Sequence, residues 1–338
     1  MPQHQRSTPF PKILMALILL CGLNAVAIPK TQAAEIEMSF QSLLQQERVW
    51  AGLQSKTLKV GDITWSYSEG GKVGQPTLIL IHGLAGSRDN WNRVAHALTE
   101  NYHVIIPDLP ASGETQVPED FDYSVPNVTE KLRRFVEAAN LKGPLHIAGH
   151  SLGGAVAMLY AAQYPFETKS LFLIDAAGVY QSAATPYLKN PAQLKNLIVS
   201  KKGDLPFLLK QVTYNPPFIP QEIAQAQEQM MIQQAGQTQK VIDQLIALNK
   251  SYTPDSFAVL TKSIDVPTLI LWGKQDKIIN VDAANELKSQ FKHAAPLVLL
   301  DHVGHMPIME ADQLVAQKYL SFLSQTEAQA VTHQPTSK

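Results

Sequence analysis

Short runs of apolar residues alternate along the chain with longer segments in which apolar and polar residues are mixed. Continuous apolar runs of about four to eight residues are typical of strands that are covered on both faces of a sheet. We expect such strands at residues 77–81, 103–107, 145–148, 171–174, 268–272 and 297–300. Two further runs, 57–60 and 63–68, are separated by Gly61 and Asp62, which predicts a hairpin at the sheet edge.

Helix-forming segments separate most of these strands. We expect helices at residues 89–98, 125–141, 155–164, 281–291 and 311–323. Regular alternation of strand and helix predicts βαβ units, in which successive strands run parallel. The chain is therefore predicted to form an α/β fold with a mostly parallel, eight-stranded sheet flanked by helices.

The alternation stops between residues 179 and 255, where the sequence is helix-like, rich in glutamine and interrupted by prolines. We interpret this segment as a helical cap inserted into a core formed by residues 34–178 and 256–325. The alternative is a set of covering helices without a gating role, because apolar helix faces usually pack on a core. The polar tail, residues 326–338, is expected to be disordered.

The first 33 residues have the pattern of an export signal. Arg6 and Lys12 precede an apolar run at residues 13–23, and Ala27 or Ala33 could close a cleavage site. This predicts a periplasmic or secreted protein, with an uncleaved membrane anchor as the alternative. The single cysteine, Cys21, lies inside this signal, so the mature chain is expected to have no disulfide.

The overall composition excludes some functions. A hydrophobic content of 45% is sufficient for a globular core, and a formal net charge of -1 gives no basic surface for nucleic acid. We therefore expect no nucleic-acid partner.

The segment Gly149-His-Ser-Leu-Gly153 joins the strand at 145–148 to the following helix. In a G-x-S-x-G turn between a strand and a helix, the serine is held in a strained conformation that exposes its hydroxyl group. Gly149 and Gly153 would leave room where strand and helix nearly touch. This pattern predicts that Ser151 is a nucleophile, although a glycine-rich turn with a solvated serine would look the same.

A nucleophilic serine needs a base, and a neutral histidine oriented by a buried carboxylate is suited to that task. His305 follows the last strand and Gly304, and we favour it as the base over His302. Asp276 follows the strand at 268–272, and we favour it as the acid over Asp175, which ends the preceding strand. The carboxyl ends of parallel strands lie at one edge of a sheet, so these residues could meet.

Other polar residues near these strand ends have structural interpretations. His150 is expected to pack within the turn, His82 to shape the loop that presents the N–H of Leu84, and Asp108 to brace a loop. The N–H groups of Leu84 and Leu152 are the candidate oxyanion donors, because a helix begins with unpaired N–H groups.

Four motifs in this order resemble the α/β-hydrolase fold superfamily over about residues 57–323. They are His82-Gly-Leu-Ala-Gly-Ser87, Gly149-His-Ser-Leu-Gly153, Trp272-Gly-Lys-Gln-Asp276 and Gly304-His-Met-Pro307. The resemblance implies roles in the oxyanion loop, the nucleophile turn, the acid loop and the histidine loop, respectively. It also implies ester hydrolysis without a cofactor or a metal ion.

Within the superfamily, Leu173-Ile-Asp-Ala-Ala-Gly178 and Tyr214-Asn-Pro-Pro-Phe-Ile-Pro220 are most similar to the cold-active bacterial triacylglycerol lipases. The implied substrate is a lipid or small-molecule ester, with transient contact to lipid surfaces. Pro110-Ala-Ser-Gly113 departs from the usual Pro-Gly-aromatic-Gly, which makes the substrate less certain than the reaction. A short-chain carboxylesterase, a carbon-carbon bond hydrolase and a catalytically silent ligand-binding protein are the alternatives.

Overall fold

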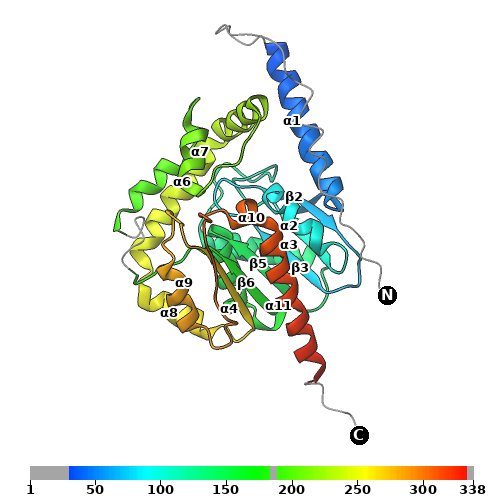
Figure 1. Ribbon diagram of the computed structural model, residues 1–338, viewed down its shortest axis with the longest axis vertical. Helices are drawn as coiled ribbons and strands as arrows, with labels where there is room; N and C mark the ends of the chain where they lie inside the picture. The colour runs from blue at the N-terminus through cyan, green and yellow to red at the C-terminus, as the bar shows by residue number, and fades with distance from the viewer. Residues whose placement is uncertain (1–29, 183–188, 333–338) are drawn as a thin grey trace.

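The computed structural model describes residues 30–182 and 189–332 (Figure 1). Its strands are β1 (Leu53–Val60), β2 (Ile63–Gly70), β3 (Thr77–Ile81), β4 (His103–Pro107), β5 (Leu145–His150), β6 (Thr168–Ile174), β7 (Thr268–Gly273) and β8 (Val298–Leu300). They form one sheet in the order β1-β2-β4-β3-β5-β6-β7-β8. The hairpin β1-β2 and the pair β2-β4 are antiparallel, and the strands from β4 to β8 are parallel. The predicted mostly parallel eight-stranded sheet is confirmed.

Helices cover both faces of this sheet (Figure 1). The described helices are α1 (Lys30–Trp50), α2 (Asn92–Leu98), α3 (Val125–Ala138), α4 (Leu152–Gln163), α6 (Asp204–Val212), α7 (Gln221–Ser251), α8 (Pro254–Ser263), α9 (Asp282–Gln290), α10 (Pro307–Glu310) and α11 (Asp312–Thr332), with 3-10 turns η2 (Arg88–Trp91), η3 (Pro165–Glu167) and η4 (Pro191–Leu197). Residues of α3, α4 and α9 share one apolar core with the sheet, and residues of α2 and α11 share another on the opposite face.

Alternate side chains of each central strand contribute to the two apolar cores. In β3, Ile79 and Ile81 belong to the core beneath α3 and α4, whereas Leu78 and Leu80 belong to the core beneath α2 and α11. Successive side chains of a strand point to opposite faces, so a strand between two helical layers must be apolar at every position. This explains the continuous apolar runs in the sequence.

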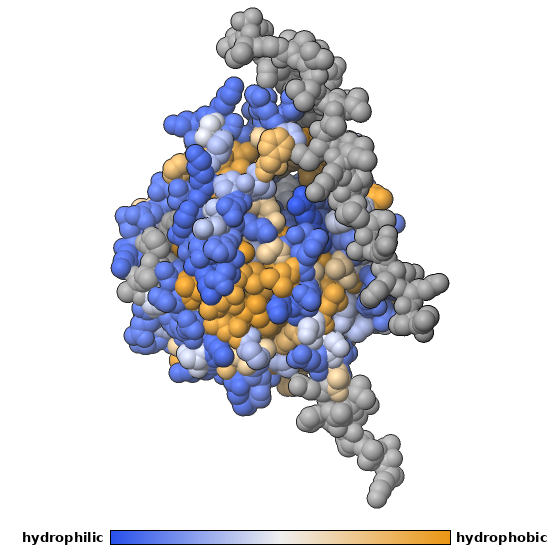
Figure 2. Space-filling model, viewed as in Figure 1, coloured by the Kyte–Doolittle hydropathy of each residue, from blue (hydrophilic) through white to orange (hydrophobic). Residues whose placement is uncertain are grey.

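Between β6 and β7, the described part of residues 179–255 contains η4, α6 and α7 but no strand. Helix α8 crosses the expected boundary at 255, because buried Phe257 packs it onto the core shared with α4 and α9. On the face shown in Figure 2, hydrophilic residues cover much of the outside of this segment, and hydrophobic residues gather nearer the centre of the view.

The expected disorder of residues 326–338 is wrong for residues 326–332, which continue α11. Thr326 is buried, and the carboxylate of Glu327 lies 2.6 Å from Nζ of Lys169 and 2.7 Å from Nε2 of His146. These partners come from β6 and β5, so the end of α11 is tied to the sheet by polar contacts between distant residues. The remaining residues, 333–338, lie outside the described part of the chain.

The predicted signal, residues 1–33, lies almost entirely outside the described residues, which begin with α1 at Lys30. Within residues 30–182 and 189–332, the helices are too short or too polar to cross a lipid bilayer. Helix α1 leads into β1, which begins at Leu53 rather than at the predicted residue 57 because its pairing with β2 extends to Gly70.

Candidate active site

Ser151 lies at the sharp turn between β5 and α4, near the centre of the sheet's carboxyl edge. Its backbone has φ of 51° and ψ of -121°, which is a strained conformation for a residue with a side chain. The N–H of Ser151 donates to the carbonyl oxygen of Ile174, and the carbonyl oxygen of Ser151 accepts from Gly154 and Ala177. These bonds to β6 and α4 hold the strained residue in place.

The flanking glycines are required by close backbone contact. A Cβ atom on Gly149 would lie 2.2 Å from the carbonyl oxygen of Gly153, and one on Gly153 would lie 2.4 Å from the carbonyl oxygen of Ile81. Both distances are far below van der Waals contact, so a larger residue would push α4 away from β5 and β3. The clearance expected from the G-x-S-x-G pattern is therefore present on both sides of Ser151.

Three predicted residues meet in one hydrogen-bonded chain. The Nε2 atom of His305 lies 2.9 Å from Oγ of Ser151, and its Nδ1 atom lies 2.8 Å from Oδ2 of Asp276. The side chains of Asp276 and His305 are buried, whereas Ser151 is partly open to the cavity above it. With Nδ1–H donated to the carboxylate, Nε2 is free to accept the hydroxyl proton of the serine.

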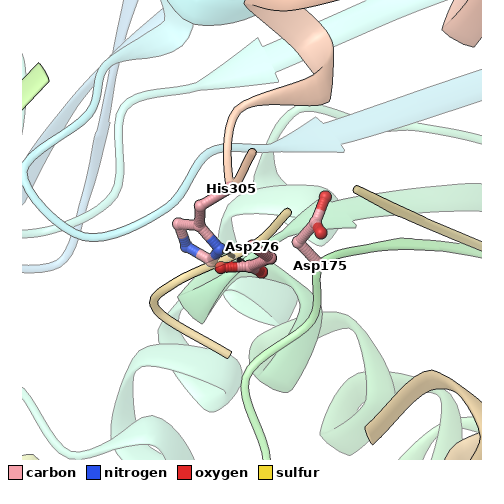
Figure 3. Close-up of side chains that lie close together, drawn as sticks. All are labelled: Asp175, Asp276 and His305. Carbon is pink, nitrogen blue, oxygen red and sulfur yellow. Dashed lines mark hydrogen bonds and ion pairs between the residues drawn. The ribbon is translucent and has the colours of Figure 1, made fainter. Parts of the chain in front are cut away.

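The two rival residues occupy different positions. His302 is exposed, has a positive φ of 61°, and lies with its ring 5.5 Å from that of Tyr214. Asp175 is completely buried at the end of β6, close to Asp276 and His305, as Figure 3 shows. The geometry thus favours His305 and Asp276, and it places Asp175 beside them in a separate position.

The three side chains in Figure 3 also form a set with metal-ligating atoms within 4.8 Å of one another. In this arrangement Nδ1 of His305 is bonded to Asp276, and Oδ1 of Asp276 accepts the N–H groups of Ile278 and Ile279 at 2.7 and 3.0 Å. Because the ligand atoms of His305 and Asp276 are already used in hydrogen bonds within the protein, we interpret the cluster as a hydrogen-bonded group of two acids and one base.

His82 shapes the loop before the candidate oxyanion donor Leu84. Its Nδ1 bonds the carbonyl oxygen of Gly83 at 2.8 Å, and its Nε2 accepts the N–H of Leu109 at 2.9 Å. Burial lowers the pKa of His82, which keeps the ring in this neutral form. A Cβ atom on Gly83 would lie 3.0 Å from Cβ of Ser151, so this loop passes directly beside the serine.

The second candidate donor, Leu152, is the first residue of α4. A helix has no carbonyl partner for the N–H groups of its first turn, and these groups carry the positive end of the helix dipole. Leu84 and Leu152 both line the cavity next to Ser151. The structure therefore places the backbone at Leu84 and at Leu152 beside Ser151, where their N–H groups could bind an oxyanion.

Asp108 braces the loop after β4. Its carboxylate accepts the N–H of Arg88 at 2.7 Å and the N–H of Glu114 at 2.9 Å, and it forms an ion pair with the Arg88 side chain. A Cβ atom on Gly113 would lie 2.1 Å from Cγ of Asp108, so only glycine fits there. The preceding Ala111 has φ of 69°, which is an unfavourable value at the position where relatives of the motif usually carry glycine.

Glu310 is a residue of the site that the sequence pattern did not indicate. Its carboxylate accepts the N–H groups of Gly304, Tyr214 and Asn215 at 3.0, 2.8 and 3.3 Å, and the N–H of His305 donates to the carbonyl oxygen of Val212 at 2.9 Å. The end of α6 is therefore fastened to the histidine loop. In the sequence Glu310 follows the motif Gly304-His-Met-Pro307 by three residues, and no pattern distinguishes it from the nearby Asp312.

A cavity of about 370 Å³ lies over Ser151 and His305. On the β6 and β7 side its walls are apolar and include Leu159, Val179, Leu248, Phe257, Leu260 and Ile278. On the β4 side its walls include the polar residues Gln41, Arg48, Ser87, Asp89, Glu114 and Gln234. The strand order places β5, and with it Ser151, between these two sides, which we call the apolar arm and the polar arm; the polar arm also includes the apolar residues Leu44, Val125 and Pro126.

Helix α1 contributes Gln41, Leu44 and Arg48 to the polar arm. The guanidinium group of Arg48 binds the Asp89 carboxylate through two hydrogen bonds of 2.6 Å and lies 3.8 Å from Glu114. These contacts fasten α1 to the loops after β3 and β4. The segment that follows the predicted signal is thus part of the cavity wall.

Both the sequence and the structure of this chain are similar to those of known hydrolases. The sequence profile of the alpha/beta hydrolase fold matches residues 76–210. Lipase 1 of Psychrobacter immobilis is 34% identical over 314 residues, which cover 92% of this chain and 96% of that protein. A crystal structure of a candidate lipase, lip1, from Acinetobacter baumannii AYE is 70% identical with a TM-score of 0.85, covering 91% of this chain and 100% of the other.

A crystal structure of a membrane phospholipase A, described as a bacterial virulence factor, is 31% identical with a TM-score of 0.81, and the match covers 87% of this chain and 93% of the other. The resemblance to the α/β-hydrolase superfamily, predicted from four motifs, and that to bacterial lipases, predicted from residues 173–178 and 214–220, are confirmed by these similarities, which extend over nearly the whole chain. The chain belongs to the α/β-hydrolase fold family.

Proposed function

We propose that this protein is a serine hydrolase that cleaves carboxylic esters, with fatty-acyl esters of glycerol as its substrates. The observation that carries the proposal is the hydrogen-bonded chain from Ser151 through His305 to Asp276, which opens into a cavity with an apolar arm. The similarity to lipases and to a phospholipase supports a lipid ester as the substrate class.

In the proposed mechanism, Oγ of Ser151 attacks the ester carbonyl carbon while Nε2 of His305 takes the hydroxyl proton. Asp276 accepts Nδ1–H and stabilises the imidazolium that forms. The proton then passes to the leaving alkoxide, which departs as an alcohol and leaves an acyl group on Ser151. Water activated by His305 releases the fatty acid in the second half of the reaction.

The negative charge on the carbonyl oxygen would be held by the N–H groups of Leu84 and Leu152. One such donor is typically worth about a hundredfold to a thousandfold in rate, because it is already oriented before the charge develops. Both donors belong to the backbone, so their positions depend on the His82 hydrogen bonds and on the glycines around Ser151.

The two arms of the cavity suggest how the ester is oriented. An apolar arm favours the acyl chain, since each buried methylene contributes about 0.8 kcal/mol of transfer free energy. The polar arm favours the alcohol, which carries free hydroxyl groups when the substrate is a partly deacylated glyceride. A cavity of about 370 Å³ is near the lower end of the range for ligand sites, which favours one enclosed acyl chain over three.

A chain-length series tests this proposal. We expect kcat/KM of the purified protein on p-nitrophenyl esters to rise from acetate toward medium chains, and 1-monoacylglycerols of the same chains to be hydrolysed. Best cleavage of acetate with a steady fall at longer chains would instead identify a short-chain carboxylesterase. Absence of ester cleavage with intact folding would favour a ligand-binding protein.

We also propose that the mature protein is exported and contacts lipid surfaces transiently. The basic and apolar pattern before Ala27 and Ala33 supports export. Phe207 on α6 and Phe218 in the following loop are 54% and 81% exposed, which supports insertion of apolar side chains into a lipid interface. Amino-terminal sequencing from a native-like host should give a start near Ile28 or Ala34, whereas Met1 on membrane-bound protein would favour the uncleaved anchor.

A further inference from the structure

Asp175 is a fully buried acid that the hydrolytic mechanism does not use. It lies at the end of β6, has a relative exposure of 0% and adopts a positive φ of 43°. Its Oδ1 atom accepts the N–H of Gly273 at 3.0 Å. Among the described residues, its Oδ2 atom has no hydrogen-bond donor although it is shielded from water. A charged oxygen left in this state would be costly.

The neighbouring carboxyl group of Asp276 has the opposite pattern. Its Oδ1 accepts two N–H groups, from Ile278 and Ile279, and its Oδ2 accepts Nδ1–H of His305. Three donors stabilise a carboxylate, so the negative charge of the pair belongs on Asp276. Asp276 has no donor of its own to offer to a second carboxylate.

The two carboxyl groups are too close to be charged together. One oxygen of each lies within 4.8 Å of the other and of a ring nitrogen of His305, and in the view of Figure 3 Asp276 lies between His305 and Asp175. The other titratable groups around Asp175 are Glu310 and Tyr180, and neither can supply a positive charge. Two carboxylates in such a site share a proton, as acid pairs in proteins commonly do.

We infer that Asp175 is held protonated and donates a hydrogen bond from Oδ2 to the Asp276 carboxylate, which makes it a positioning residue for the His305-Asp276 pair. This inference rests on the proposed function for its catalytic consequence, but its protonation can be tested without activity. Burial raises the pKa of Asp175 well above its ordinary range, and the charge of Asp276 raises it further.

The assigned role explains why the site holds two acids at successive strand ends. Asp276 is bonded along one side to the loop at 278–279 and at its tip to His305. A donor from Asp175 would fix the carboxylate from the β6 side as well. The carboxylate would then keep its orientation when His305 becomes charged during turnover, because each remaining lone-pair direction is occupied.

A first experiment measures stability against pH with Asp175→Asn, whose amide keeps both an acceptor for Gly273 and a donor for Asp276. The wild type must take up a proton at Asp175 on folding above about pH 4, whereas the variant does not. The folding equilibrium constant of the variant relative to wild type, from reversible urea unfolding, should therefore rise by up to about tenfold per pH unit between pH 4 and the folded-state pKa. A ratio that is constant or falls with pH would overturn the inference.

Asp108→Asn is the matched control, because Asp108 is the other aspartate with 0% exposure but forms an ion pair with Arg88. Removing its charge takes one of two carboxylate partners from the buried Arg88 guanidinium and leaves only the half-exposed Glu114, so this variant should be less stable than wild type at neutral pH. A stability ratio that rises with pH for Asp175→Asn, together with a loss of stability at neutral pH for Asp108→Asn, would distinguish a protonated acid from an ion-paired one.

A second experiment measures kcat and KM against pH. Asp175→Asn should keep kcat within about threefold, and the acid limb of kcat/KM should stay in place because no charge has been removed. Asp175→Ala removes the donor, so kcat should fall by about tenfold at constant KM and the acid limb should move to higher pH. If Asp175 were ionised, Asp175→Asn would move the acid limb to lower pH by about two units at an effective dielectric constant of about 20, which would overturn the inference.

The two experiments can fail independently, so they distinguish an error in the proposed function from an error in the inference about Asp175. If the wild type hydrolyses no ester, the proposed function is wrong, but the stability ratio still decides the protonation state of Asp175. If Asp175→Ala does not fold, Asp175→Asn still decides the protonation state, and Asp175→Gly, which tolerates the positive φ of 43° and also lacks a donor, replaces it in the positioning test. Wild-type-like hydrolysis by Asp175→Ala with an unmoved acid limb would show that Asp175 does not position Asp276.

Discussion

The ring of His150 donates its Nε2–H to the backbone carbonyl oxygen of His305 across 2.7 Å. The residue beside Ser151, the proposed nucleophile, is therefore bonded to His305, the proposed base, and the two histidine rings lie 5.1 Å apart. The sequence predicts only that His150 packs within the turn. In the structure its hydrogen bond also fixes the position of the histidine loop. This contact links β5 directly to the segment after β8.

The pH dependence of stability should report the burial of His150. Burial lowers its pKa to about 3, with the nearby His305 and His82 adding to the effect. An unfolded histidine takes up a proton near pH 6.5, so the stability is complete above that pH and is lost as the pH falls toward the folded-state value. We expect His150 to cost about 3 kcal/mol of unfolding free energy between pH 6.5 and pH 4.

The measurement for His150 compares wild type with His150→Gln, whose amide can still donate to the carbonyl group. Urea unfolding at pH 7 and pH 4 should show a smaller loss of stability in the variant. Equal losses in both proteins would mean that His150 is already charged in the folded state or has an ordinary pKa there.

Substitutions in the hydrogen-bonded chain should abolish ester hydrolysis without unfolding the protein. Ser151→Ala and His305→Ala should each lower kcat by about ten-thousandfold or more, and Asp276→Asn should lower it somewhat less, because these residues act as one unit. His302→Ala is the control, since this exposed histidine lies outside the chain, and it should retain activity. Strong loss in His302→Ala with activity in His305→Ala would identify the other histidine as the base.

Gly153→Ala should destabilise the protein strongly. Its Cβ atom would lie 2.4 and 2.5 Å from the carbonyl oxygens of Ile81 and His82, and backbone atoms cannot move aside cheaply. We expect a loss of about 3 kcal/mol in unfolding free energy. Gly236→Ala, with open space inside α7, should instead gain about 0.5 to 1 kcal/mol. Similar denaturation midpoints for the two variants would contradict the close approach of α4 to β3.

A bulky residue in the apolar arm should shorten the preferred acyl chain. Leu159 lies on α4 and lines the cavity, so Leu159→Trp should fill part of the arm. The variant should cleave short p-nitrophenyl esters nearly normally and lose kcat/KM on longer ones. Val259→Trp, at an α8 position that is 71% exposed, should leave the profile unchanged. An unchanged profile in Leu159→Trp would place the acyl chain in the other arm.

The sequence by itself determined the sheet and the strained turn. Strands such as 77–81 and 103–107 could be predicted to the residue, because a strand buried on both faces must be apolar at every position. The turn at Gly149-His-Ser-Leu-Gly153 could be predicted because close backbone approach excludes any side chain but hydrogen. Both are local constraints, which a single stretch of sequence records.

Only the tertiary structure decided which partners meet. The contact of His305 with Ser151, the placement of Asp175 beside Asp276 and the hydrogen bonds of Glu310 to the loop after α6 all join residues distant in sequence. The polar end of α11 looked disordered because its partners, including Lys169, lie on strands far along the chain. A hydrogen bond depends on distance and direction between atoms, and these are set by how the sheet and its covering helices pack rather than by any local pattern.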